Sequence, residues 1–246
     1  MNYNMTFKDW LSFKLDPKEM IVQGNGPGLQ YFLGLEKEKK SAYDTPISHL
    51  LGLQFRLEEK FNNLSQYDFS QVNTQSCYCN FTIRQNRRKE IIETIKDKNF
   101  TTEGQASSSG KELEADCYIN SLIKHRFCVS PEGNGEDCHR HYESLILKSI
   151  PIIEDPDSPC PDKPWLTKGE DTMRRWKLPS RIKDKYEDLP VLYTSNYKEI
   201  NNDYLDEQYE KILNTTYNFE KLTRSYWLKE SFLGVIEFNR TGRWPT

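Results

Sequence analysis

The most informative part of this chain is the stretch Phe127-Cys-Val-Ser-Pro-Glu-Gly-Asn-Gly-Glu-Asp-Cys-His-Arg-His-Tyr-Glu143. Its first three residues are apolar and predict a short buried strand, and Gly133 and Gly135 then mark a turn. The residues from Asp137 onward predict the start of a helix. The first N–H groups of a helix have no partners within it, and together with the helix dipole they attract an anion, most often a phosphate.

Two charged residues follow that turn on one face of the expected helix, because Arg140 and Glu143 are three positions apart. Arg140 can meet a diphosphate while Glu143 accepts hydrogen bonds from sugar hydroxyls. The stretch therefore predicts the chemistry that holds a nucleotide-sugar. Two simpler interpretations stay open: the glycines only allow a tight turn, or Arg140 and Glu143 form a weak ion pair at the surface.

Short apolar segments and amphipathic segments alternate on both sides of this stretch. Strands are expected at residues 78–83, 99–102, 127–129, 150–153 and 189–193. Helices are expected at residues 87–96, 113–123, 138–148, 197–213 and 219–232. Such alternation is typical of a doubly wound, parallel α/β sheet, in which ligands bind beyond the carboxyl ends of the strands. The 131–137 turn is expected at that edge.

Composition narrows the function classes. The chain has 246 residues and a net charge of -3, so no global field draws it to nucleic acid or to an anionic membrane. No run approaches the roughly 20 apolar residues that a membrane span requires, and the first residues do not form a secretory signal. We therefore expect a soluble, cytoplasmic protein.

The six cysteines are expected to be mostly free thiols, with Cys117 and Cys128 buried as small apolar side chains. A zinc site built from Cys138-His-Arg-His141 with Cys128 or Cys160 is an alternative. The paired Cys-x-x-Cys spacing of structural zinc sites is absent, and His139 and His141 point in different directions on a helix. We therefore expect no metal.

The segment Ser130–Glu143, followed by Ser144-Leu and then Ile150-Pro-Ile-Ile153, resembles the nucleotide-sugar-binding signature of exostosin-like glycosyltransferases. A related signature occurs in α1,3-fucosyltransferases. The resemblance extends over residues 77–230, and its flanking parts are Cys79–Ile83 with Asn86, Tyr186–Val191, Leu205–Leu213 and Phe219–Trp227.

This resemblance implies a GT-B-like architecture of two Rossmann-like lobes, with the donor bound to the C-terminal lobe. On this basis residues 1–75 form a reduced, acceptor-side lobe, residues 76–232 form the nucleotide-sugar lobe, and residues 233–246 are a tail. The implied reaction is an inverting, metal-independent transfer from a UDP-sugar, such as UDP-xylose, to a glycan acceptor, without any cofactor. The compact form is similar to enzymes of large algal viruses, among them a xylosyltransferase.

Three other functions remain open: a GDP-fucose-dependent transferase, a non-catalytic nucleotide- or glycan-binding lobe, and a zinc-bound interaction protein. In the transferase interpretation, Arg140 contacts the diphosphate or the ribose, and Glu143 accepts the ribose hydroxyls. Arg84 and Arg88 neutralise the leaving diphosphate, and His139 donates to the phosphates. The complete predicted donor set is Asn80, Thr82, Arg84, Arg88, Ser130, Pro131, Gly133, Asn134, Gly135, Asp137, His139, Arg140 and Glu143.

Several residues outside this set carry further expectations. An inverting transfer needs a base for the acceptor hydroxyl, and the candidates are Asp44 and His49 in the N-terminal segment. Trp165 and Trp176 are candidates for an acceptor platform. The family usually has a glycine where this chain has Lys148, so the helix before residue 150 is expected to end without a left-handed turn.

Overall fold

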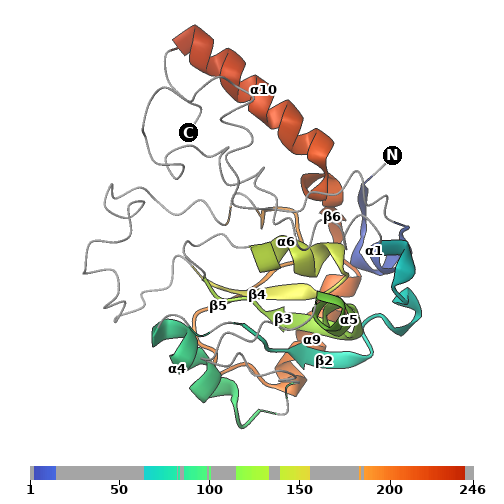
Figure 1. The fold of residues 1–246 in the computed structure, drawn as a ribbon, viewed down its shortest axis with the longest axis vertical. Helices are drawn as coiled ribbons and strands as arrows, with labels where there is room; N and C mark the ends of the chain where they lie inside the picture. The colour runs from blue at the N-terminus through green and yellow to red at the C-terminus, as the bar shows by residue number, and fades with distance from the viewer. Residues whose placement is uncertain are drawn as a thin grey trace.

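The computed structural model describes residues 3–14, 64–81, 83, 86–98, 100, 115–132, 139–155, 183 and 186–241 (Figure 1). Within these ranges, a four-stranded parallel sheet has the spatial order β2-β3-β4-β5. Its strands are β2 (Gln75–Tyr78), β3 (His125–Val129), β4 (Ile150–Glu154) and β5 (Leu192–Thr194). The parallel α/β sheet that the sequence predicts is confirmed and is compatible with a Rossmann-like fold.

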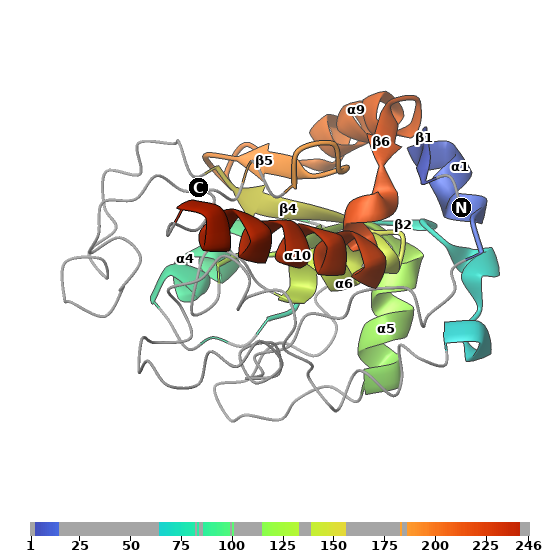
Figure 2. The same cartoon turned by 90° about the horizontal axis from the view of Figure 1, so that it is seen from above.

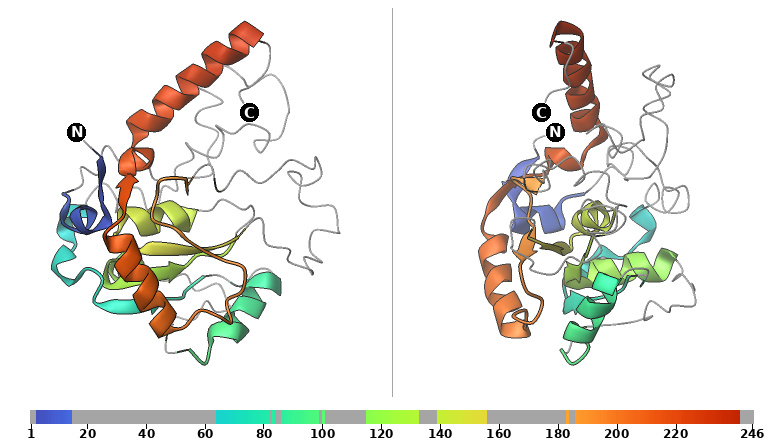
Figure 3. Two further views of the ribbon diagram at one scale, coloured as in Figure 1. Left: turned by 180° about the vertical axis from the view of Figure 1, so that it is seen from behind. Right: turned by 90° about the vertical axis from the view of Figure 1, so that its left-hand side faces the viewer.

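Helices cover both faces of this sheet. The longer helices that follow the strands are α4 (Asn86–Ile95), α5 (Ala115–Lys124), α6 (His139–Ile146) and α9 (Asn202–Leu213). Helix α9 lies on one face of the sheet, and α5 and α6 lie on the other (Figures 2 and 3). The central strands are therefore buried on both sides, which explains their continuous apolar runs.

The first described residues pack against this sheet domain. Strand β1 (Asn4–Thr6) pairs antiparallel with β6 (Thr216–Asn218), and helix α1 (Phe7–Ser12) follows it. Trp10 of α1 is fully buried and stacks on Phe219, with ring centroids 4.1 Å apart. Because residues 15–63 lie outside the described ranges, the division into lobes at residues 75 and 232 stays a prediction.

The remaining described elements are short except for the last helix. They are the 3-10 helices η1 (Leu64–Gln66), η2 (Phe69–Gln71) and η4 (Phe219–Leu222), and helix α10 (Arg224–Thr241). Helix α10 projects from the body of the molecule (Figure 1) and exposes Phe232, Leu233 and Ile236. Among the described helices, none combines the length and the apolarity that crossing a membrane would require.

The end of α6 corrects one sequence prediction. Lys148 has a φ of 69°, so α6 does end in a left-handed turn although the residue is not glycine. The N–H of Lys148 donates to the carbonyl of Leu145, and the N–H of Ser149 donates to the carbonyl of Ser144. This is the Schellman pattern of hydrogen bonds, and it satisfies carbonyls that the helix end would leave unpaired.

The side chain of Lys148 compensates for this backbone position. It is 1% exposed, and its Nζ donates to the carbonyl oxygens of Trp10 at 2.6 Å and Phe13 at 3.2 Å. The amine also lies 3.7 Å from the centre of the Trp10 ring. Long-range contacts that a single sequence does not reveal therefore hold a lysine where glycine is usual.

Several predicted boundaries were wrong. Strand β2 ends at Tyr78, and the buried residues 79–81 have already left the sheet. Strand β5 begins at Leu192, and α9 begins only at Asn202 because the Asn201 side chain caps it. The last helix extends to Thr241, well past the predicted end.

Two further predictions concern single residues. Phe100 is buried but belongs to no strand, and its neighbours at 99 and 101–102 lie outside the described residues. Cys117 is exposed, not buried, because Ile119, Leu122 and Ile123 form the buried face of α5 and Cys117 faces the opposite way. Cys128 is fully buried, as predicted, and the cysteines of the described part of the chain are free thiols.

Candidate functional site

The predicted donor-site residues that the structure describes lie where the strands end. Ser130 and Pro131 directly follow β3 and are buried, and Asn80 follows β2 and is 8% exposed. Arg140 and Glu143 lie on α6, which begins at His139. The fold thus brings two strand ends and one helix together at the edge where α/β sheets bind ligands.

The two oxygens of the buried Glu143 carboxylate have different surroundings. Glu143 is 4% exposed, and its Oε2 accepts a 2.7 Å hydrogen bond from the hydroxyl of Tyr118 on α5. Its Oε1 is buried and has no hydrogen-bond partner in the described part of the chain. The interpretation of Arg140 and Glu143 as a surface ion pair is therefore wrong, since the carboxylate lies inside the protein.

The pKa of Tyr118 reflects the charges around this carboxylate. Burial of Tyr118, and then the negative charge of Glu143, raise the pKa of its hydroxyl well above the usual value. The positive charge of Arg140 acts in the opposite direction on the same pKa. Arg140 also opposes the burial-driven rise in the pKa of Tyr78 and of Cys79. The charge of Arg140 therefore acts both on the tyrosine that holds Glu143 and on groups at the end of β2.

His141 of α6 holds Ser130, the residue that directly follows β3. His141 is fully buried, with Nε2 3.1 Å from the carbonyl of Ser130 and Nδ1 3.2 Å from the hydroxyl of Tyr186. A carbonyl oxygen can only accept, so Nε2 carries the proton and Nδ1 accepts from the tyrosine. Both ring nitrogens are thus engaged, which leaves neither for the zinc site that the sequence offered as an alternative.

The other members of that zinc hypothesis were Cys128, Cys138, Cys160 and His139. Cys138, Cys160 and the side chain of His139 lie outside what the structure describes. Within the described ranges, no group of three or more His, Cys, Asp or Glu residues could hold a metal ion.

Arg88 has a contact that the sequence did not predict. Its Nε donates to the carbonyl of Glu132 at 2.8 Å, and its guanidinium lies 5.7 Å from the centre of the Phe81 ring. Arg88 therefore holds the backbone at Glu132, three residues after β3 ends. A direct role for Arg88 on the diphosphate stays a prediction.

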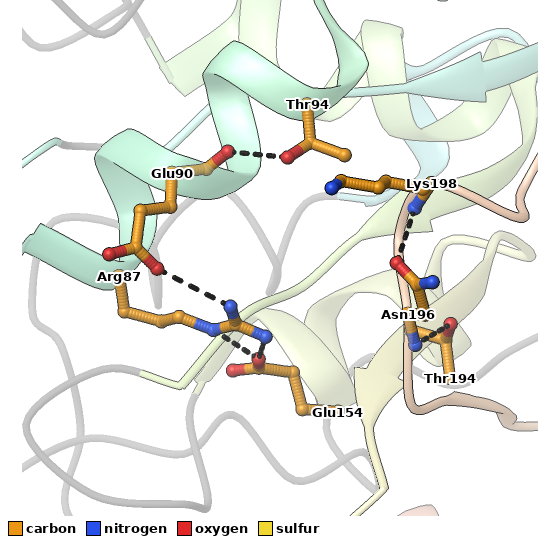
Figure 4. Close-up of polar contacts among 7 residues, drawn as sticks. All are labelled: Arg87, Glu90, Thr94, Glu154, Thr194, Asn196 and Lys198. Atoms are coloured by element: carbon orange, nitrogen blue, oxygen red, sulfur yellow. Dashed lines mark hydrogen bonds and ion pairs between the residues drawn. The ribbon is translucent and has the colours of Figure 1, made fainter. Parts of the chain in front are cut away.

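Sequence reasoning missed a second polar cluster at the same edge of the sheet (Figure 4). Arg87 in the first turn of α4 donates from Nε to Glu154 Oε1 at 2.6 Å, and its Nη2 contacts the same oxygen. Glu154 ends β4 and is 8% exposed. Tyr197 is buried just beyond β5, three residues after Thr194, which pairs with Glu154. The charges of Glu154 and Arg87 act in opposite directions on the pKa of Tyr197. The sequence feature that could have indicated this cluster is a glutamate at the end of an apolar strand.

The candidate bases Asp44 and His49, and the donor-set residues Thr82, Arg84, Gly133, Asn134, Gly135 and Asp137, lie outside the described residues, as do Trp165 and Trp176. Their roles stay predictions.

Residues 58–237 match the family described as the RXYLT1 C-terminal domain. The chain belongs to this family. It is a xylosyltransferase family of the exostosin-like group, so the predicted relationship to glycosyltransferases is confirmed. Comparison of the sequence with curated proteins finds no match.

Membership of the RXYLT1 C-terminal domain family gives the described cluster a chemical context. A glycosyltransferase family implies a nucleotide-sugar donor and a glycan acceptor. The matched residues include both ends of α6 and the ends of all four parallel strands. The polar groups around Glu143 and Glu154 thus belong to the part of the chain that defines the family.

Proposed function

We propose that this protein transfers a sugar, xylose in the first instance, from a UDP-sugar to a glycan acceptor. The observation that carries the proposal is the environment of Glu143, within a chain of the RXYLT1 C-terminal domain family. One oxygen of this buried carboxylate is held by Tyr118, and the other has no partner among the described residues. A carboxylate oriented in this way is suited to accept a hydrogen bond from a ribose hydroxyl.

Arg140 supplies the second half of donor recognition. Arg140 is three residues before Glu143 on α6, so the two share a helix face. The positive charge of Arg140 acts on groups at the end of β2. We assign it to the diphosphate, together with the N–H groups at the start of α6. As the sugar leaves, negative charge grows on the departing nucleotide, and these groups stabilise it without a requirement for metal.

The remaining parts of the mechanism extend the same proposal. The transfer inverts the anomeric centre by direct displacement, with Asp44 or His49 accepting the proton of the acceptor hydroxyl. The donor lobe is one of two lobes in a GT-B-like arrangement. These assignments rest on the resemblance in sequence, and the base is best found by substituting Asp44 and His49 separately.

Isothermal titration of UDP and of GDP tests the donor class. We expect UDP to bind more tightly than GDP, and Arg140→Ala to weaken UDP binding about tenfold, the scale of one lost charge-assisted hydrogen bond. Arg240→Ala is the matched control, because Arg240 is exposed at the far end of α10 and pairs with Glu237. Tighter binding of GDP would favour the fucosyltransferase-like alternative, and binding of neither nucleotide would refute the proposal.

Turnover distinguishes an enzyme from a binding lobe. We expect the wild-type protein to release UDP from UDP-xylose when glycan acceptors are supplied. Binding of UDP without any release of UDP across a panel of acceptors would indicate a nucleotide-binding protein that has lost its catalytic base.

A further inference from the structure

The hydroxyl of Tyr197 is a buried polar group whose partner is missing from the described structure. Tyr197 is 3% exposed, and its hydroxyl makes no hydrogen bond with any described residue. Leaving a buried hydroxyl unpaired destabilises a folded protein, so each such group calls for an explanation. A ligand that supplies the missing hydrogen bond is one such explanation.

The backbone around Tyr197 is held in place by local hydrogen bonds. Thr194 Oγ1 accepts from the N–H of Asn196, and Asn196 Oδ1 accepts from the N–H of Lys198 (Figure 4). The Nζ of Lys98, just beyond α4, donates to the carbonyl of Lys198 at 2.7 Å. The unpaired hydroxyl is therefore built into a fixed turn after β5.

A carboxylate with a spare oxygen lies on the neighbouring strand, because Glu154 of β4 pairs with Thr194 of β5, three residues before Tyr197. Glu154 directs only Oε1 toward Arg87, and Oε2 forms no hydrogen bond within the described ranges. After burial, the negative charge of Glu154 is the largest influence that raises the pKa of Tyr197. The contact between Arg87 and Glu154 can be explained as a structural ion pair. That ion pair does not explain why the Tyr197 hydroxyl has no hydrogen-bond partner among the described residues.

This cluster and the Arg140–Glu143 pair lie at the carboxyl ends of neighbouring parallel strands. Glu154 ends β4, which pairs with β3, and Ser130 directly after β3 contacts His141 of α6, the helix that carries Arg140 and Glu143. One extended ligand can therefore reach both clusters along the carboxyl ends of the strands. A nucleotide-sugar has this form, with a ribose and diphosphate at one end and a pyranose at the other.

We propose that Glu154 and Tyr197 bind the hydroxyl groups of a neutral pyranose on the donor, while Arg87 holds Glu154 in position. This inference rests on the proposed function. A hydroxyl-rich ring supplies both the donor that Glu154 Oε2 accepts and the partner that the Tyr197 hydroxyl needs. A ring that carries its own carboxylate is disfavoured, because Glu154 would repel it. The cluster therefore selects neutral sugars over uronic acids.

The test compares UDP with UDP-xylose by isothermal titration. We expect the wild-type protein to bind UDP-xylose about tenfold more tightly than UDP, because the sugar gains hydrogen bonds at this cluster. In Tyr197→Phe, we expect this ratio to fall to about threefold or less while the affinity for UDP changes by less than about twofold. The melting temperature should not fall, since the substitution removes an unpaired buried hydroxyl.

Tyr209→Phe is the matched control. The Tyr209 hydroxyl accepts a 3.0 Å hydrogen bond from Asn73 Nδ2, before the amino end of β2. We expect this control to lower the melting temperature and to leave the ratio of the two affinities unchanged. Opposite effects of the two substitutions on stability and on sugar binding separate a ligand-binding hydroxyl from a structural one.

Glu154→Gln gives a second and independent test. UDP-glucuronic acid is UDP-xylose with a carboxylate added to the ring, and we expect the wild-type protein to bind it about tenfold more weakly than UDP-xylose. Glu154→Gln should narrow that difference to about threefold or less.

The possible results separate this inference from the proposed function. If wild-type protein binds UDP but binds UDP-xylose no more tightly, the sugar site is wrong and the nucleotide site stands. If both variants keep the wild-type ratios, the sugar site is likewise refuted. If UDP itself does not bind, both proposals fall together.

Discussion

Replacement of Glu143 by glutamine should leave stability almost unchanged while it weakens nucleotide binding. The carboxylate is 4% exposed and has one hydrogen bond, from Tyr118, to offset its removal from water. Glutamine keeps the shape of the side chain and can still accept from Tyr118, so the variant loses mainly the charge. Replacing a buried, poorly paired ion with a neutral group is often neutral or stabilising.

The expected magnitudes follow from this arrangement. The free energy of unfolding in urea should fall by no more than about 0.5 kcal/mol, whereas removing one partner of a buried structural ion pair costs about 3–5 kcal/mol. UDP binding should weaken about tenfold, or about 1.4 kcal/mol, because a charge-assisted hydrogen bond to the ribose becomes an ordinary one. A functional carboxylate and a structural one therefore give clearly different results.

Two assays measure the two quantities, and a third checks the cause. Urea denaturation gives the stability, and titration with UDP gives the affinity. Ultraviolet titration of tyrosine should show a lower pKa for Tyr118 in Glu143→Gln, since the charge of Glu143 helps to raise it. A loss of stability of several kcal/mol with unchanged UDP affinity would show that Glu143 is structural and would remove the basis of the proposed donor site.

Three further predictions concern the framework around the site. Lys148→Met should lower the free energy of unfolding by about 1–2 kcal/mol in urea, because the Trp10 and Phe13 carbonyls lose their donor. Burial lowers the pKa of Lys148 in the folded protein. Between that lowered pKa and the usual value near 10.4, the unfolded chain binds more protons than the folded one, so the free energy of unfolding should rise with pH. This pH dependence should vanish in Lys148→Met. Asn201→Ala should cost about 1 kcal/mol by thermal unfolding, because its side chain accepts from the N–H of Tyr204 at the start of α9.

The parts of the fold that depend on local pattern could be predicted from the sequence. The apolar runs at Phe127–Val129 and Ile150–Ile153 are fully buried strands, and the amphipathic segment of α4 lies within one residue of its predicted bounds. Strand β2 was placed too late because residues 79–81 are as buried as a strand, yet leave the sheet. Burial and strand pairing are different properties, and an apolar pattern reports only burial.

In the candidate site, too, local spacing could be predicted from the sequence and long-range contacts could not. Arg140 and Glu143 are three residues apart on one helix, so their shared face follows from sequence alone. Arg87 and Glu154 are 67 residues apart, and Tyr197 comes from a third segment beyond β5. Contacts of this kind depend on the order of the strands, which a single sequence does not determine. The residues of the second cluster could not therefore be grouped before the structure was known.

Helix α6 links these observations, because it is held at both ends by residues distant in sequence. Near its start, His141 holds the carbonyl of Ser130, and Tyr186 holds the other side of the ring. At its end, Trp10 Nε1 donates to the carbonyl of Leu145 at 3.1 Å, and Lys148 donates back to Trp10. A non-glycine residue at a φ of 69° is tolerated only where the surrounding structure fixes it, and this turn lies on the helix that carries Arg140 and Glu143. Helix α1 thus helps to hold α6, which carries Arg140 and Glu143. Loosening α1 should therefore weaken UDP binding even when Arg140 and Glu143 are intact.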